Sequence, residues 1–150
     1  MRMQILQHCQ GVIENMIDNV IISLPLVIVL PRKTKEPKVF ALNLNNFRNA
    51  HHFIMNNAKK IMKDIIEAIA KDVIFPDPPY IFSYTIYPAS ARKFDLGNVA
   101  PGVQKFTDDA LVELGKIKDD NYKIIKEVHY YFGGVDKENP RAELNIQTKR

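Results

Sequence analysis

Three prolines within four residues, Pro76, Pro78 and Pro79, interrupt the chain near its middle. A helix cannot continue through them, because each proline lacks an amide hydrogen and clashes with the preceding turn. Before them lies the clearest helical pattern of the sequence, which Asn49 can cap. Its apolar residues recur at helical spacing: Phe53, Ile54, Ala58, Ile61, Met62, Ile65, Ile66 and Ile69. The sequence therefore predicts a long amphipathic helix that ends before the prolines.

Segments with strand character flank this helix. Val20 to Leu30 is rich in β-branched residues and bounded by Pro31, so we expect a buried strand with a bulge, a break or an edge position at Pro25. A basic loop follows, and a hairpin with the next strand is the simplest arrangement. The remaining predicted strands run from Val39 to Leu42, from Tyr80 to Tyr87, from Ile124 to Phe132 and from Arg141 to Gln147.

Two further helices complete the pattern. One is predicted from near Val99 to Leu114, with Pro101 in its first turn. The other is a short N-terminal extension within residues 1–18, with Cys9 among its apolar positions. The order is helix, two strands, helix, strand, helix, two strands. It predicts a single α+β domain over residues 1–150, with two layers in which helices pack on one face of a mixed or mostly antiparallel sheet.

Composition narrows the class of protein. A chain of 150 residues with 46% hydrophobic content is long enough for one domain with a real core. Its single cysteine cannot form an intramolecular disulfide, which favours a reducing compartment. The longest apolar run is shorter than the roughly 20 residues that span a bilayer, so we expect a soluble cytoplasmic protein without a membrane partner. The net charge of +4 favours a polyanionic partner.

Isolated carboxylates surround the second predicted helix. Asp95 lies before it, Asp109 within it, and Asp119 and Asp120 just after it. Carboxylates at these turns and on the helix can converge at one end of the sheet. Oxygen ligands of this kind suit Mg²⁺, which is usually held by one or two carboxylates plus water and phosphate, and Mn²⁺ accepts the same ligands. The pattern is typical of a phosphodiesterase site, in which Lys105 can stabilise developing charge.

Each of these residues also has an ordinary structural explanation. Lys105 and Asp109 are four residues apart, so they can form a solvated ion pair on one helix face. Asp95 and Asn98 can cap the helix, and capping is the favoured interpretation for Asn98. Asp120 can belong to a polar turn between the helix and the next strand.

Three short segments carry a resemblance to a known family. They are Arg92-Lys93-Phe94-Asp95-Leu96-Gly97-Asn98, then Lys105 with Asp109-Ala110-Leu111, and finally Asp119-Asp120-Asn121. In this combination the chain, from about Asn43 to Ile146, resembles the RusA-like Holliday junction resolvases, particularly their phage-type members. Gly97 stands where the family has its second aspartate, and the interval from Asp95 to Lys105 is longer than in the family.

The resemblance implies a RusA-like fold and a specific chemistry. Asp95 and Asp120 would bind the metal, and Lys105 would be the catalytic lysine. Our leading hypothesis adds Asp109 as a third acidic ligand. The family acts as homodimers that bind four-way DNA junctions and make paired nicks by Mg²⁺-dependent hydrolysis. Such an enzyme would work in recombination or on branched replicating DNA, in the cytoplasm of a bacterium or a phage-infected cell.

Basic residues that can contact DNA phosphates occur in three groups. The first predicted hairpin carries Arg32, Lys33, Lys35 and Lys38; the entrance of the long helix carries Arg48, His51 and His52; and the turn before Asp95 carries Arg92 and Lys93. For each residue, ordinary surface solvation is the alternative.

Three hypotheses follow for function. The leading one is a homodimeric, Mg²⁺-dependent crossover junction endonuclease. The second is a non-catalytic protein that binds branched DNA, in which Gly97 marks lost chemistry. The third is a small basic protein that contacts other proteins and shows no junction preference.

Overall fold

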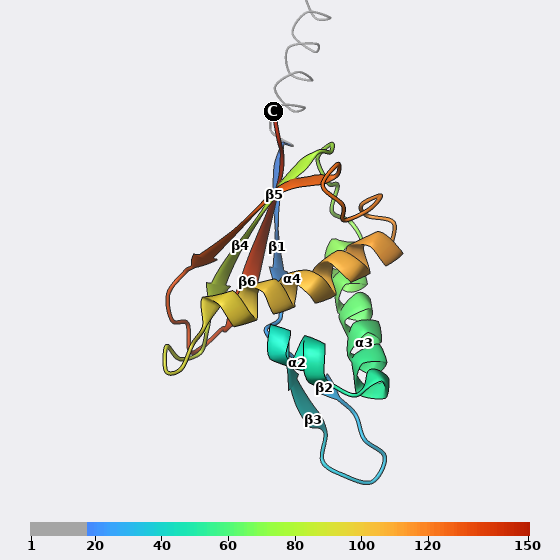
Figure 1. Cartoon of the computed structure of the whole chain (residues 1–150), viewed down its shortest axis with the longest axis vertical. Helices are drawn as coiled ribbons and strands as arrows, with labels where there is room; N and C mark the ends of the chain where they lie inside the picture. Colours follow the sequence, from blue (N-terminus) through green and yellow to red (C-terminus); the bar gives the residue numbers. More distant parts are fainter. Residues whose placement is uncertain (1–17) are drawn as a thin grey trace, which may run out of the picture.

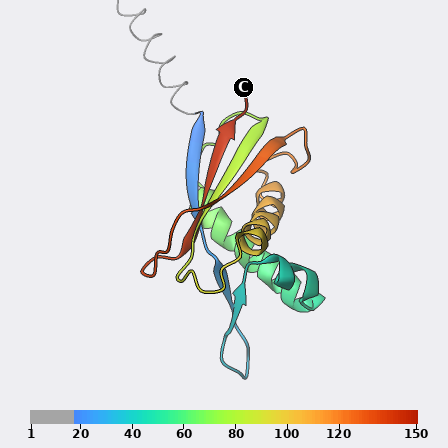
Figure 2. The same cartoon turned by 60° about the vertical axis from the view of Figure 1, so that its left-hand side comes forward.

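The computed structural model of the chain describes residues 18–150. These residues form a two-layer α+β fold, which confirms the predicted class: a mixed four-stranded sheet is covered by helices. Figure 2 shows that the two long helices lie on the same side of this sheet. The helix predicted within residues 1–18 and Cys9 fall outside the described residues, Asp18 excepted.

The four-stranded sheet has the order β1-β6-β4-β5. Strand β6 pairs antiparallel with both β1 and β4, whereas β4 and β5 are parallel. A parallel pair needs a crossover connection, and helix α4 (Leu96–Glu113) supplies it between β4 and β5. The bounds are Asn19–Leu24 for β1, Tyr80–Tyr87 for β4, Ile125–Phe132 for β5 and Arg141–Thr148 for β6.

A second sheet consists of a hairpin, β2 (Val27–Leu30) with β3 (Lys38–Ala41). The sequence predicts one strand from Val20 to Leu30, but the structure divides it into β1 and β2, which belong to different sheets. The division falls at Pro25, which has no amide hydrogen for a ladder. The predicted hairpin is confirmed for β2 and β3, and Figure 1 shows it projecting beyond the body at the end away from the C-terminus.

The long helix predicted after Asn49 is confirmed as α3 (His52–Ala70), and a short helix that the sequence did not predict, α2 (Leu44–Asn49), precedes it. Asn49 is the last residue of α2 and not a cap. The caps are Asn43, whose side chain accepts from the Asn46 amide, and His51, whose Nδ1 accepts from the Phe53 amide. Ala50 has an extended backbone, and this break turns the chain between the two helices.

Helix α4 (Leu96–Glu113) begins three residues before the predicted start. Asp95 caps it by accepting from the Gly97 amide at 3.0 Å, so the expected capping by Asn98 is wrong. The Asn98 side chain accepts instead from the Asn45 amide at 3.2 Å, which ties α4 to α2. Pro101 lies inside the helix and not in its first turn, and the Gly97 carbonyl therefore receives no bond from residue 101.

One core joins the sheet, the hairpin and the helices. Side chains alternate along β4, where the buried face consists of Tyr80, Phe82, Tyr84 and Ile86. Buried residues of α3 and α4 cover this face: Ala58, Met62, Ile66, Ala70, Ala100, Val103, Phe106, Ala110 and Leu111. Each fully buried large side chain of this kind contributes about 1.5–3 kcal/mol relative to an exposed one.

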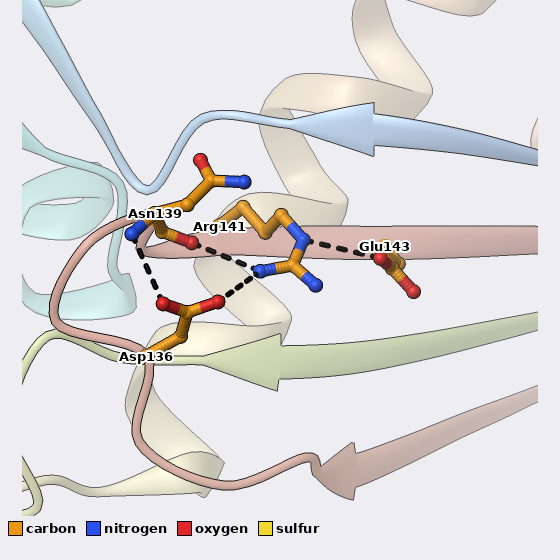
Figure 3. Close-up of polar contacts among 4 residues, drawn as sticks. All are labelled: Asp136, Asn139, Arg141 and Glu143. Atoms are coloured by element: carbon orange, nitrogen blue, oxygen red, sulfur yellow. Dashed lines mark hydrogen bonds and ion pairs between the residues drawn. The ribbon is translucent and has the colours of Figure 1, made fainter.

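The loop between β5 and β6 is held by Arg141 (Figure 3). Its guanidinium donates to Asp136 at 2.8 Å, to Glu143 at 3.1 Å and to the Asn139 carbonyl at 3.0 Å. It also lies over the Tyr87 ring, 4.2 Å from the centroid. Donation from Arg141 holds the pKa of Asp136 below its usual value. These contacts give Arg141 a structural role.

Across residues 18–150, no helix combines the length and the apolar character that a bilayer crossing needs.

Candidate functional site

The structure brings Asp109 and Asp120 to the same hollow at the C-terminal half of α4. This open depression has a volume of about 460 Å³ and receives side chains from α3, α4 and the loop that follows α4. Its lining consists of Lys59, Phe106, Asp109, Ala110, Val112, Glu113 and Asp120. Two carboxylates that lie eleven positions apart in the sequence thus line the same hollow.

Asp109 forms an ion pair, but with a partner on another helix. Its carboxylate lies 3.3 Å from Lys59 Nζ on α3, whereas the sequence suggests a pair with Lys105. One turn later on α4, Glu113 pairs with Lys63 of α3 at 3.2 Å. All four side chains are substantially exposed, so these pairs contribute little to stability. They do place two lysines beside the hollow.

Asp108 is the residue of this region that the sequence pattern does not single out. It is only 4% exposed. Its Oδ2 accepts from Gln104 Nε2 at 3.0 Å, and Tyr84 of β4 donates to Oδ1 at 3.5 Å. Tyr130 of β5 donates to Gln104 Oε1 and extends the chain of hydrogen bonds. Asp108 therefore joins α4 to the two parallel strands beneath it.

Burial raises the pKa of Asp108 to about 7. The hydrogen bond from Gln104 and the charge of Lys105 act in the opposite direction, while the negative charges of Asp120 and Asp109 raise the pKa further. Burial, together with the charge of Asp108, also raises the pKa of Tyr84 and of Tyr130. Asp108, Asp109, Asp120 and Lys105 thus share one electrostatic neighbourhood.

Asp119 serves the turn after α4. Its Oδ1 accepts from the Asp120 amide at 2.7 Å and its Oδ2 from the Asn121 side chain at 2.7 Å. The hydrogen bond from the Asp120 amide is the main reason that the pKa of Asp119 lies below its usual value. The Asp119 carboxylate therefore stabilises the polar turn after α4, and the same turn places Asp120 at the hollow.

Asp95 lies at the opposite end of α4 from Asp109. Because a helix rises about 1.5 Å per residue, their backbones are about 20 Å apart. The expected convergence of Asp95 with Asp109 within one chain is therefore wrong, and the reason is the uninterrupted length of α4. Lys105 lies between the two ends with an exposed side chain.

The oxygen donors at the hollow suit a hard cation. Within residues 18–150, no three histidine, cysteine, aspartate or glutamate side chains are grouped so that they could hold one metal ion. Mg²⁺ is commonly held by one or two carboxylates together with water and phosphate oxygens. Asp109 and Asp120 are a donor set of that kind, with Asp108 next to Asp109 in the chain.

The predicted DNA-contacting residues lie outside the hollow. Lys33 and Lys35 are exposed in the β2–β3 loop, and Arg48 is exposed in the last turn of α2. The remaining members are also exposed: Arg32 and Lys38 of the hairpin, His51 and His52 at the start of α3, and Arg92 and Lys93 before α4. Lys93 has a positive φ of 56°, a conformation that a non-glycine residue adopts uncommonly and that marks a tight turn before Asp95.

One sequence signal could have identified Asp108. It follows Gln104 by four residues, and glutamine with aspartate at this spacing on a helix can form a hydrogen bond. Its neighbours Phe106, Ala110 and Leu111 are apolar and recur at helical spacing, which predicts an apolar helix face. A polar pair at the border of such a face indicates a buried hydrogen-bonded site.

No protein-family model matches this chain, and no curated protein is significantly similar to it.

Proposed function

We propose that this protein is a homodimeric, Mg²⁺-dependent endonuclease that cleaves four-way or branched DNA. The observation that carries the proposal is the convergence of Asp109 and Asp120 at one hollow, beside the buried Asp108 and the cationic Lys59. The net charge of +4 and the resemblance of the segments around Asp95, Lys105 and Asp120 to junction resolvases support the same substrate.

The residues divide the chemistry between them. Asp109 and Asp120 hold the cation, for which Mn²⁺ can substitute. A cation held there would supply Lewis-acid chemistry, that is, activation of a water and neutralisation of charge on the phosphate. Lys59 and Lys105 stabilise negative charge on the phosphodiester as it develops. Asp108 acts through its neighbours: its bonds to Gln104 and Tyr84 fix α4 against the sheet and so position Asp109.

Asp95 has a different place in this proposal. Its distance of about 20 Å from Asp109 along α4 is too long for one cation within a single chain. In the proposed homodimer, Asp95 acts from the partner subunit, where two-fold symmetry would create two equivalent sites. Paired nicks at a pseudo-symmetric junction need two such sites.

The direct test is cleavage of a labelled four-way junction by the purified protein, with and without Mg²⁺. A linear duplex of the same sequence is the matched substrate. We expect paired nicks in the junction only, and only with the metal. Cleavage that continues in EDTA, or no cleavage of any branched DNA at any metal concentration, would overturn the proposal.

A second candidate is a non-catalytic protein that binds branched DNA. Two observations favour it: Lys59 and Lys63 partly neutralise Asp109 and Glu113, and the exposed Gly97 offers no carboxylate at the start of α4. Such a protein would prefer the junction over the duplex equally well in EDTA and in Mg²⁺, and it would leave both substrates intact.

A further inference from the structure

The β2–β3 hairpin presents an apolar face to solvent. Val29 and Val39 are directly opposite each other on the two strands, and they are 54% and 64% exposed. Val27, two positions before Val29 and on the same face, is 48% exposed. The other face carries Ile28, Leu30 and Phe40, which are buried in the core. The exposed valines are therefore not needed to attach the hairpin to the body.

The apolar face continues toward the body of the molecule. Val27 and its cross-strand partner Ala41 form part of the wall of a second hollow, with a volume of about 470 Å³. Leu26, Leu42 and Phe94 are among its other walls. A mainly apolar surface thus leads from the middle of the hairpin to the loop between β4 and α4. Contiguous exposed apolar surface of this kind marks an interaction site more often than isolated side chains do.

The tip of the hairpin is strongly cationic. Residues 31–37 form the loop between the two strands, and all of them are exposed. The loop begins and ends with proline. Arg32, Lys33 and Lys35 lie in this loop and Lys38 follows it, against a single acidic residue, Glu36. Arg32 Nε donates to the Glu36 carbonyl at 2.7 Å, which closes the loop across its base. Figure 1 shows the hairpin as a narrow projection from the body. The basic residues lie in the loop at its end, and the valines lie on the two strands behind that loop.

We propose that this hairpin is the element that recognises the branch point of DNA. The cationic tip contacts phosphates at the crossover, and the valines contact the base faces that become unstacked there. A two-stranded ribbon is narrow enough to enter a DNA groove, and proteins that distort DNA often insert apolar side chains between bases. This inference rests on the proposed function for the identity of the ligand, but it concerns binding and not cleavage.

Branched DNA fits this surface better than a lipid membrane does. Surfaces that bind membranes usually carry tryptophan, phenylalanine or leucine at the part that enters the bilayer. Here the residues of the tip, 31–37, are charged residues, prolines and one threonine, and the valines lie behind them on the strands. Phosphates on both sides of a branch can meet the cationic tip while the valines reach the bases.

The valine face is tested by the double variant Val29→Thr, Val39→Thr. Threonine keeps the β-branched shape and the strand preference, so the fold is retained. Affinity is measured in EDTA for a four-way junction and for a linear duplex of the same sequence. We expect the junction preference to fall about tenfold while duplex affinity hardly changes. Val135→Thr, at an exposed valine of the β5–β6 loop, is the matched control and should change neither affinity.

The cationic tip is tested by Lys33→Gln, Lys35→Gln. Loss of two phosphate contacts should weaken binding to both DNAs and lower the slope of log K against log salt by about 1.8. Lys137→Gln, another exposed lysine, should leave the slope unchanged. An unchanged slope in the tip variant would overturn the assignment of the tip.

Failure of this inference can be distinguished from failure of the proposed endonuclease. A valine-dependent junction preference without cleavage supports the hairpin and overturns the nuclease. Metal-dependent cleavage with a junction preference that survives the threonine variant overturns the hairpin alone. Valine-dependent binding to vesicles of phosphatidylserine and phosphatidylcholine, without binding to junction DNA, would also overturn it.

Discussion

The buried carboxyl of Asp108 makes the stability of the folded protein depend on pH. It is enclosed by Gln104, Tyr84 and the body of α4, and it lies near the charges of Asp109 and Asp120. Its pKa of about 7 means that the folded protein holds a proton that the unfolded chain releases near pH 4. Between these two values the folded state binds more protons, so stability falls as the pH rises. Above about pH 7 this contribution stays at its lowest.

Asp108→Asn should remove this pH dependence. Asparagine has nearly the same shape and its side-chain oxygen can accept the bond from Gln104, but it cannot ionise. Relative to the wild type, we expect the variant to gain up to about 4 kcal/mol at pH 8 and nearly nothing at pH 4. Thermal unfolding at a series of pH values measures the difference. Glu138→Gln, at an exposed carboxylate, is the control, and a D108N effect independent of pH would contradict this account.

The packing of helix α4 against α2 depends on one close contact between their backbones. Gly102 lies where α4 meets the start of α2, and a Cβ at this position would come within 2.2 Å of the Asn43 Cα. Backbone atoms on both sides cannot yield as a flexible side chain would. The glycine therefore permits the contact between α4 and α2, although glycine in a helix interior usually costs about 1 kcal/mol relative to alanine.

Gly102→Ala should accordingly destabilise the protein by about 1–3 kcal/mol, because overpacking outweighs the gain in helix propensity. Gly97→Ala is the matched control on the same helix, where the new Cβ would meet only the Asp95 carboxylate, at an ordinary 3.5 Å. We expect that control to be neutral or stabilising by up to about 1 kcal/mol. Urea denaturation of both variants provides the comparison, and equal stability changes in the two would contradict the close approach.

Periodicity predicted most of the elements, because alternation and helical spacing depend on which faces are buried. β4 was predicted with its exact bounds, and β5 and β6 to within one residue at each end. The errors fall where tertiary packing decides between local options. From the sequence, Pro25 is compatible with a bulge or with a break in the strand. The structure shows a break, because β1 and β2 belong to different sheets. Asn49 and Asn98 are good caps in principle, yet α2 and Asp95 displace them.

The candidate site was predicted in part for the same reason. Asp109 and Asp120 were identified from residue type and spacing, and the structure places both at one hollow. Asp95 was grouped with them from residue type, although most of the helix that separates them was itself predicted; the structure starts α4 at Leu96, directly after Asp95, and so places the two ends far apart. Asp108 was missed because its importance comes from Tyr84 and Tyr130, which belong to strands distant in the sequence.

The length of α4 separates Asp95 from Asp120, although the proposed chemistry needs both aspartates. Asp95 and Asp120 can serve one site only if two protomers contribute to it. Mixing Asp95→Asn protomers with Asp120→Asn protomers tests this arrangement. Each variant alone should be inactive, whereas the mixed dimer contains one site with both wild-type aspartates and should make single nicks. An inactive mixture, or full activity of Asp95→Asn alone, would leave Asp95 with only its role as a helix cap.

The most direct test of the central claim compares Asp109→Asn and Asp120→Asn with Glu138→Gln in Mg²⁺-dependent cleavage of a four-way junction. Junction binding in EDTA is measured alongside, so that loss of folding is not mistaken for loss of chemistry. The account predicts that both aspartate variants bind the junction and fail to cleave it, while the glutamate variant cleaves as the wild type does. Undiminished cleavage by the Asp120→Asn protein would contradict the assignment of the acidic centre at the C-terminal half of α4.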